Sequence, residues 1–492
     1  MSLLLRGVRL VPVGRATPVD LVDVRLVGGV VSEIGRGLAA GASEVLPADG
    51  RWLIPGLWDA HVHLGQWARQ GMRLDVAGTR TRTEALSRIV LGLDSGSGLV
   101  VGGGYRPATW AEPPTVASLD SVTGERPVVL VSGDAHAGWC NSAALRLLGL
   151  RHRDDPITEA DWFAALPAVL AIEDAQVGPG AYAAALGAAA RLGVVGVCDF
   201  EFEPGFRTWP QRAVAVGAPL RVRTSTYPHD LAEVIASGLR TGDVLGDADG
   251  GPLVTMGSLK IISDGSLNTR TAHCCEPYAD ASHGVQNVPA DELAVLLGMA
   301  TSHGLEVALH AIGDAAVRIA VDAFAATGAK GTIEHAQLGR REDFARMARL
   351  GLVASVQPAH LLDDRDVTAG IWGEDRAARS FEFRELVDAG VGLALGSDAP
   401  VARLDPWLAM AASVHRGEPD DLPWFPEHSL TPAEALAAST GGRATVSVGD
   451  PADVALLDAD PLASFDPVAA ARRLRTMSVH ATIVGGRVVH RA

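Results

Sequence analysis

Apolar runs of strand length alternate with alanine-rich stretches of helical length along the middle of the 492-residue chain. A strand that is buried on both faces is a continuous apolar run, and runs that alternate with helices predict repeated β-α units and a parallel sheet. Eight runs fit this pattern, and eight is the number of parallel strands that closes a barrel. They are Ile54–His63, Val194–Phe200, Leu220–Tyr227, Val254–Asp264, Leu305–Asp314, Gly331–His335, Leu352–Gln357 and Val391–Asp398.

The two ends of the chain have a different pattern. Short β-type runs with glycine and proline between them fill residues 3–45, and the same pattern returns in residues 453–489, so the two ends are expected to pair into one small β-domain. About 130 residues separate the first two apolar runs, and a connection of that length predicts an inserted subdomain. The predicted domains are 1–53 with 442–492 for the β-domain, 54–75 with 185–441 for the barrel, and 76–184 for an inserted α/β subdomain near the active site.

Charge and composition narrow the classes of partner. The chain has a formal net charge of −16 and no stretch rich in lysine and arginine, so nucleic acid and anionic membranes are not expected as partners. No apolar run has the length of a signal-peptide core at the N-terminus or of a membrane span. Its four cysteines show no Cys-x-x-Cys spacing and suit a reducing compartment. We therefore expect a soluble cytoplasmic protein that acts on a small molecule, and a homo-oligomer is left open.

Two histidines stand one residue apart near the end of the first run. In a strand, residues i and i+2 share a face, so His61 and His63 can reach one metal ion while Val62 faces the other way. A His-x-His pair alone is weak evidence, because two solvated histidines on a strand are more common than a metal site. The ends of the other runs decide between these interpretations.

Polar residues also stand on the other apolar runs near their ends, where barrel enzymes place their chemistry. Each has an ordinary explanation, since a lone buried histidine is usually hydrogen-bonded within the core and Asp398 has the sequence context of a turn. Six such residues at one rim are hard to explain that way, and together they predict a metal site. The six are His61, His63, Lys260, His310, His335 and Asp398.

Lys260 lies within an apolar run, where an unpaired ammonium group is costly. A buried ion pair with Asp264 or Glu334 is one interpretation, although arginine would serve that role. Only two of the 42 basic residues are lysines, Lys260 and Lys330. The retained lysine favours chemistry that arginine cannot perform, namely loss of a proton and reaction with carbon dioxide to give a carbamate that bridges two metal ions.

Four further residues are candidates for contact with the substrate. His136, in a polar turn, can donate a hydrogen bond to a substrate carbonyl or its oxyanion, with an ordinary surface histidine as the alternative. His360 is a similar candidate with weaker support. Arg270 can anchor an anionic group, although a loop salt bridge explains it equally well. Trp139 is a candidate pocket wall, with core packing as its alternative.

The motifs around these residues resemble those of the amidohydrolase superfamily over nearly the whole chain. They are similar in particular to the amidohydrolase family 3 branch, whose metal-dependent hydrolases include N-substituted formamide deformylase. The segments that carry the resemblance are Pro55–His63, Asp134–Leu145, Leu259–Leu267 with Arg270–Ala272, His310–Asp314, Glu334–Gln337 and Ser397–Pro400.

The resemblance implies a distorted (β/α)8 TIM barrel of the α/β class, with a composite β-sandwich from both termini and an insertion after the first barrel strand. It also implies one or two divalent metal ions, usually zinc, and a carbamylated Lys260 that bridges two ions. By carry-over, the ligands of one ion are His61, His63 and Asp398, and those of the other are His310 and His335. A site with a single ion that uses part of this set also occurs in the superfamily.

These residues lead us to expect a metal-dependent hydrolase that cleaves a carbon–nitrogen bond other than a peptide bond through a metal-activated hydroxide. Asp398 is the expected general acid-base, which takes a proton from the hydroxide and delivers it to the leaving nitrogen. An alternative keeps the metals and acts on an ester, a lactone or a phosphoester. A non-catalytic barrel with an assembly or regulatory role is disfavoured, because residues able to bind metal stand at all six ligand positions.

Overall fold

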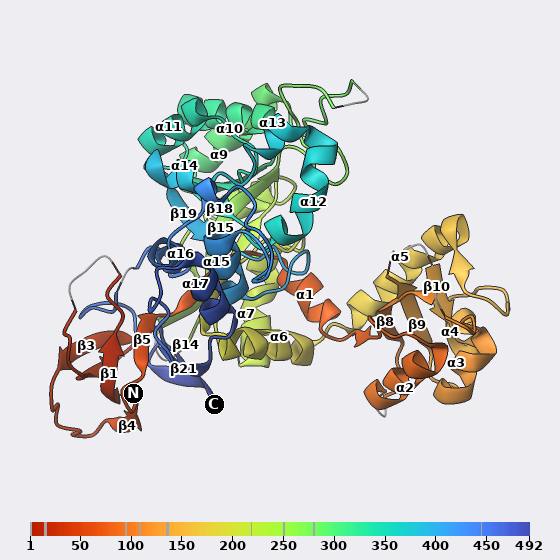
Figure 1. The fold of residues 1–492 in the computed structure, drawn as a ribbon, viewed down its shortest axis with the longest axis horizontal. Coiled ribbons are helices and arrows are strands. Elements are labelled where there is room, and N and C mark those ends of the chain that lie inside the picture. Colours follow the sequence, from red (N-terminus) through yellow and green to blue (C-terminus); the bar gives the residue numbers. More distant parts are fainter. Residues whose placement is uncertain are drawn as a thin grey trace. The chain divides into compact units, whose positions relative to one another are not determined.

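The computed structural model describes residues 2–13, 17–93, 96–107, 110–133, 137–217, 219–248, 251–278, 281–443 and 445–492. The chain divides into two compact units, one of residues 1–64 with 186–492 and the other of Gly65–Ala185. Figure 1 labels the elements of both units along the chain. The finer boundaries that the sequence predicts stay a prediction.

The first unit contains a barrel of parallel strands. Within the described residues, the main path of its sheet is β19-β18-β17-β16-β15-β13-β12-β6, and all neighbours on this path are parallel. All eight predicted runs contribute a barrel strand, which confirms the predicted fold class. The strands are β6 (Leu57–Val62), β12 (Val194–Asp199), β13 (Arg221–Thr226), β15 (Gly251–Ile262), β16 (Val307–Ala311), β17 (Gly331–His335), β18 (Val353–Val356) and β19 (Gly392–Leu395), with β14 (Val244–Ala248) antiparallel to β15.

The first predicted run is divided between two sheets. Its beginning belongs to β5 (Trp52–Pro55), which pairs with β1 (Ser2–Leu10) and β20 (Val454–Leu457) outside the barrel. Gly56 separates β5 from β6, and a Cβ atom at this position would lie 2.1 Å from Cγ1 of the buried Val195. The chain therefore passes from one sheet to the next through a residue that must be glycine, because any side chain would overlap β12.

The barrel closes between the residues that follow β19 and the end of β6. The amide of Asp398 donates to the carbonyl of His61 at 2.7 Å, and the amide of His63 donates to the carbonyl of Ala399 at 2.8 Å. A parallel bridge joins Val62 and Ala399. This closure fixes Asp398 beside the two histidines of the first strand.

Helices connect the barrel strands, as β-α units require. α10 shows the local logic, because its buried face consists mainly of alanine and valine and it ends at Gly328 in the left-handed conformation with φ 67°. The helical elements of this unit are α6 (Pro179–Arg191, which begins in the second unit), α7 (Gly205–Val216), α8 (Leu231–Ala236), α9 (Ala290–Ser302), α10 (Asp314–Thr327), α11 (Arg341–Leu350), α12 (His360–Trp372), α13 (Glu374–Ala377), α14 (Phe383–Asp388), α15 (Pro406–His415), the 3₁₀ helix η2 (Pro426–His428), α16 (Pro432–Ala438) and α17 (Pro467–Arg475).

Strands from both termini form the predicted composite β-domain. Their sheet follows the order β22-β21-β20-β5-β1-β2-β3, with β4 paired to β1. One hydrophobic core joins residues from the two ends of the chain, including Leu5, Val24, Leu456 and Ile483, each at most 1% exposed. The remaining strands of this domain are β2 (Val22–Val27), β3 (Val30–Gly35), β4 (Glu44–Pro47), β21 (Val479–Val484) and β22 (Arg487–Arg491).

The second unit is the predicted insertion after the first barrel strand, and it has a sheet of its own in the order β11-β10-β9-β8-β7. Its elements, apart from the start of α6, are α1 (Leu64–Gln70), β7 (Leu74–Asp75), α2 (Arg82–Gly92), β8 (Val100–Tyr105), α3 (Val116–Thr123), β9 (Val128–Ser132), β10 (Ala137–Cys140), α4 (Ser142–Leu147), β11 (Ile157–Thr158) and α5 (Glu159–Gln176). Among the helices of the described residues, none combines the length and the apolar character needed to span a bilayer.

Candidate metal centre

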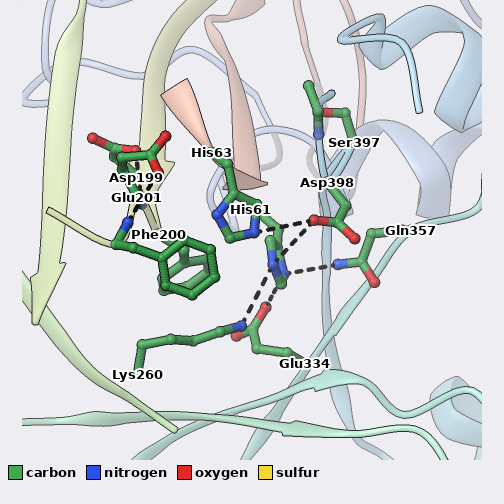
Figure 2. A network of polar contacts seen from close by, with 12 residues as sticks. His61, His63, Asp199, Phe200, Glu201, Lys260, Glu334, Gln357, Ser397 and Asp398 are labelled. Atoms are coloured by element: carbon green, nitrogen blue, oxygen red, sulfur yellow. Dashed lines mark hydrogen bonds and ion pairs between the residues drawn. The ribbon is translucent and has the colours of Figure 1, made fainter. Parts of the chain in front are cut away.

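The six predicted ligand positions form one cluster at the rim of the barrel. The His61 ring lies 5.0 Å from the His335 ring, and the His335 ring lies 4.5 Å from the His310 ring, between ring centres. Nζ of Lys260 lies 3.4 Å from Nε2 of His61. Figure 2 shows His61 and His63 from the end of β6, Lys260 from β15 and Asp398 from the segment after β19 close together. The structure therefore brings together residues that are more than 300 positions apart in the sequence.

Asp398 is the carboxylate around which the cluster is arranged. Its Oδ1 lies 3.5 Å from Nε2 of His61 and 3.4 Å from Nε2 of His63, while its Oδ2 lies 3.7 Å from Nε2 of His360. Its backbone has φ 58°, in the left-handed region that aspartate tolerates better than most residues. One carboxylate thus faces three imidazoles, with an oxygen on each side.

Two groups of ligand atoms in this cluster are close enough to hold a metal ion. The first is the predicted set of His61, His63 and Asp398, and the second is His335, His360 and Asp398. Within each group the ligand atoms lie within 4.8 Å of one another. The geometry thus adds His360 to the candidate ligands, and the substrate contact predicted for it stays a prediction.

Glu334 determines how His61 presents its ring. Nδ1 of His61 lies 2.7 Å from Oε2 of Glu334, and both side chains are almost fully buried. A carboxylate at Nδ1 keeps the proton on that nitrogen, so the lone pair of Nε2 faces Asp398 and Lys260. This carboxylate–histidine arrangement is typical of metal-binding histidines in proteins.

His310 and His335 occupy the side of the cluster next to Asp264. Nε2 of His310 lies 3.2 Å from the carbonyl of Gly265 and 3.4 Å from Oδ1 of Asp264. The Asp264 carboxylate is fully buried and accepts hydrogen bonds from the amides of His273, Ile312 and Gly313. Asp264 therefore holds the loops around His310 in place and does not pair with Lys260, as one interpretation of the sequence proposed.

Burial sets the charge of the imidazoles. Burial and the nearby Lys260 ammonium lower the pKa of His310 to about 4 and hold the pKa of His61 well below its ordinary value. Burial likewise lowers the pKa of His335, together with its neighbour His310. These histidines are neutral at neutral pH, which is the form that binds a metal ion.

The two carboxylates and the lysine respond differently to the same burial. Burial raises the pKa of Glu334, and it would also raise that of Asp398, but His61, His63 and His360 hold the pKa of Asp398 below its ordinary range. Burial lowers the pKa of Lys260, whose Nζ lies 4.2 Å from the ring centre of Phe200. Asp398 is therefore ionised, and Lys260 is shifted toward the neutral amine.

The residues of the cluster fit a bound divalent ion. Nδ1 of His63 and Nε2 of His360 are buried and have no hydrogen-bond partner among the described residues. A buried polar atom without a partner costs free energy, so these nitrogens call for a ligand that the protein itself does not supply. An ion held by His335, His360 and Asp398 would account for Nε2 of His360. The nitrogen of His63 that faces Asp398 is Nε2, so this ion does not account for Nδ1 of His63.

The other predicted substrate contacts are His136, Trp139 and Arg270. His136 lies outside the described residues. Trp139 is fully buried in the core of the second unit, where its indole N–H donates to the carbonyl of Thr115. The structure therefore agrees with core packing as the role of Trp139. Arg270 is exposed in the loop after β15 with φ 57°, and its role toward a substrate stays a prediction.

Sequence reasoning did not assign two residues of the site their roles. Glu334 was recognised only as a motif residue and as a potential partner of Lys260, whereas it pairs with His61. Gln357 ends the seventh predicted run, and its Nε2 lies 3.4 Å from Nδ1 of His61. The sequence could have indicated Gln357, because this residue stands at the end of a predicted strand. Nothing in the sequence indicates the direction in which the Glu334 side chain points.

Comparison with known sequences covers both the barrel and the site. The profile described as the amidohydrolase family matches residues 44–490 of the chain. The chain belongs to the amidohydrolase family. Membership confirms the resemblance drawn from the motifs and identifies the chain as a hydrolase.

Individual relatives match over most of their length. The chain is 28% identical over 508 residues to Protein LONG AFTER FAR-RED 3 of Arabidopsis thaliana, covering 92% of this chain and 85% of that protein. It is 25% identical over 517 residues to N-substituted formamide deformylase of Arthrobacter pascens, covering 93% of each. An uncharacterized metal-dependent hydrolase of Pyrococcus furiosus shares the fold, with a TM-score of 0.77 at 24% identity over 94% of this chain and 100% of that one.

Replacing Glu334 by glutamine tests its action on His61. The amide cannot hold the His61 proton as the carboxylate does, so we expect metal affinity to fall about 10–100-fold, as for other partners of metal-binding histidines. Competitive titration of zinc against a chromophoric chelator measures the change. The exposed Glu306 gives the matched control, Glu306→Gln. Equal zinc affinities of Glu334→Gln and the unmodified protein would rule out this role.

Proposed function

We propose that this amidohydrolase cleaves the carbon–nitrogen bond of a small amide other than a peptide, such as an N-formyl or N-acyl amine or a cyclic amide. The observation that carries the proposal is the ionised Asp398 carboxylate facing three histidines at the barrel rim. The relative named N-substituted formamide deformylase, which aligns over 93% of this chain, supports the bond type.

A divalent ion bound at these residues, zinc in our proposal, supplies Lewis acidity and a water of lowered pKa. Asp398 is placed to take a proton from the attacking water and to return it to the leaving nitrogen, since the carboxylate has one oxygen toward His61 and His63 and the other toward His360. Glu334 keeps His61 in the required tautomer. A single carboxylate, that of Asp398, therefore performs both proton transfers in this proposal.

A substrate series tests the bond type. We expect hydrolysis of N-formyl amines, N-acyl amines or cyclic amides by the zinc-loaded protein to exceed that of matched esters, lactones and phosphoesters in kcat/KM. Asp398→Asn should lower kcat about 10²–10⁴-fold, the range of general acid-base catalysis. Asp375→Asn, at an exposed aspartate, should not. A clear preference for esters, lactones or phosphoesters would overturn the proposal and favour the alternative.

We further propose that Lys260 is carbamylated by carbon dioxide and bridges two ions. Lys260 is 1% exposed, and its Nζ lies 3.4 Å from a ring nitrogen of His61, so a carboxyl group added to Nζ would lie beside a candidate metal ligand. A neutral amine is the form that reacts with carbon dioxide, and arginine offers no such group.

The two lysines of the chain give a matched pair of variants for this claim. Native mass spectrometry under gentle conditions should show the mass of one added carbon dioxide in the unmodified protein and in Lys330→Arg, where the lysine is exposed. Lys260→Arg should lose that mass and bind the second ion at least about 100-fold more weakly, the upper end for groups that support metal ligands. A fully active Lys260→Arg variant would exclude the carbamate.

A further inference from the structure

A second cluster of metal-binding side chains lies apart from the barrel-rim histidines. Glu382 and Glu385 stand three residues apart at the start of α14, which places them on one face of the helix. His428 ends η2, and α14 contacts η2. One ligand atom from each of the three side chains lies within 4.8 Å of the others.

The hydrogen bonds of His428 leave a ring nitrogen that faces an acceptor. Its Nε2 lies 2.8 Å from the carbonyl of Ala378, so this nitrogen carries a proton and donates it. Its Nδ1 lies 2.7 Å from Oε2 of Glu385. With the proton on Nε2, a neutral imidazole turns the lone pair of Nδ1 toward Glu385, and a second ring proton that pairs with this carboxylate is the alternative. Metal-binding histidines usually donate their other N–H to a carbonyl in this way.

Glu382 has no partner of its own. Its residue is 7% exposed, yet its carboxylate makes no hydrogen bond and no ion pair with any residue that the structure describes. Buried carboxylates are normally paired, hydrogen-bonded or bound to metal, so this side chain points to a ligand beside His428.

The surrounding cations do not fill that role. The guanidinium of Arg416 is fully buried, but it donates to the carbonyls of Ser380, Phe381 and Trp424 and to no carboxylate among the described residues. Arg341 reaches Oε1 of Glu385 only at 3.9 Å, and its side chain is 82% exposed. Arg379, Arg341 and Arg416 temper the charge of Glu382, and none of them forms an ion pair with it among the described residues.

We propose that Glu382, Glu385 and His428 form a second metal site, which holds one divalent transition ion such as zinc. Two carboxylate oxygens and one imidazole nitrogen are a donor set that zinc uses in proteins, with a fourth position left for water. The ion would tie the start of α14, which precedes the last barrel strand β19, to η2, which follows that strand. This role is separate from the proposed hydrolysis.

Anomalous diffraction from crystals of the zinc-loaded protein tests the site directly. Crystals grown after removal of weakly held metal, measured on both sides of the zinc absorption edge, should show a peak bounded by Glu382, Glu385 and His428. A peak at the barrel rim is judged separately, so failure here and failure of the proposed function are distinguishable. The absence of a peak beside His428, or a peak only after millimolar zinc is added, would overturn the site.

Metal content of variants gives a second readout. Glu382→Gln keeps the size of the side chain and removes its charge, and we expect it to retain one zinc ion per chain fewer than the unmodified protein. The control is Glu374→Gln, at an exposed glutamate nearby in the sequence, which should retain all of its zinc. Equal zinc content in both variants would show that the cluster is an ion pair of a protonated His428 with Glu385. If Glu382→Gln does not fold, the diffraction experiment on the unmodified protein still decides.

Discussion

The closure of the barrel is the constraint on which the candidate site depends. Two main-chain hydrogen bonds, from the amide of Asp398 to the carbonyl of His61 and from the amide of His63 to the carbonyl of Ala399, join the last strand to the first. They place the carboxylate of Asp398 against both histidines although 335 positions separate residues 63 and 398. The left-handed backbone of Asp398 belongs to the same turn. A barrel that failed to close would keep its strands and lose its candidate metal centre.

Burial then gives the site its chemical character. Water is excluded from His61, Lys260 and Glu334, each about 1% exposed, and in such surroundings an uncompensated charge is costly while a paired one interacts strongly. Neutral imidazoles, one ionised carboxylate at Asp398 and a lysine shifted toward its neutral form all follow from this balance. Metal binding requires neutral imidazoles and an ionised carboxylate, so the fold holds these groups in the protonation states that bind an ion.

The sequence predicts the barrel well because each buried parallel strand is a continuous apolar run, and all six ligand positions come from the same pattern. The division of the first run at Gly56 was not predictable, since it follows from contact with Val195 on a distant strand. Glu334 illustrates another limit. Along a strand, neighbouring side chains point to opposite faces, yet both Glu334 and His335 reach the cluster because the backbone of His335 turns to φ 68° at the strand end. His360 was placed among substrate contacts because nothing in the sequence reveals how close α12 brings it to Asp398.

We propose that Asp398 unites two groups of histidines into one metal centre, because both groups of ligand atoms include its carboxylate. Titration of zinc into chelator-treated protein by isothermal calorimetry tests this most directly when the unmodified chain is compared with Asp398→Asn. We expect the folded variant to bind at least one zinc ion per chain fewer than the unmodified protein. Equal stoichiometry and equal affinity in the two proteins would contradict it.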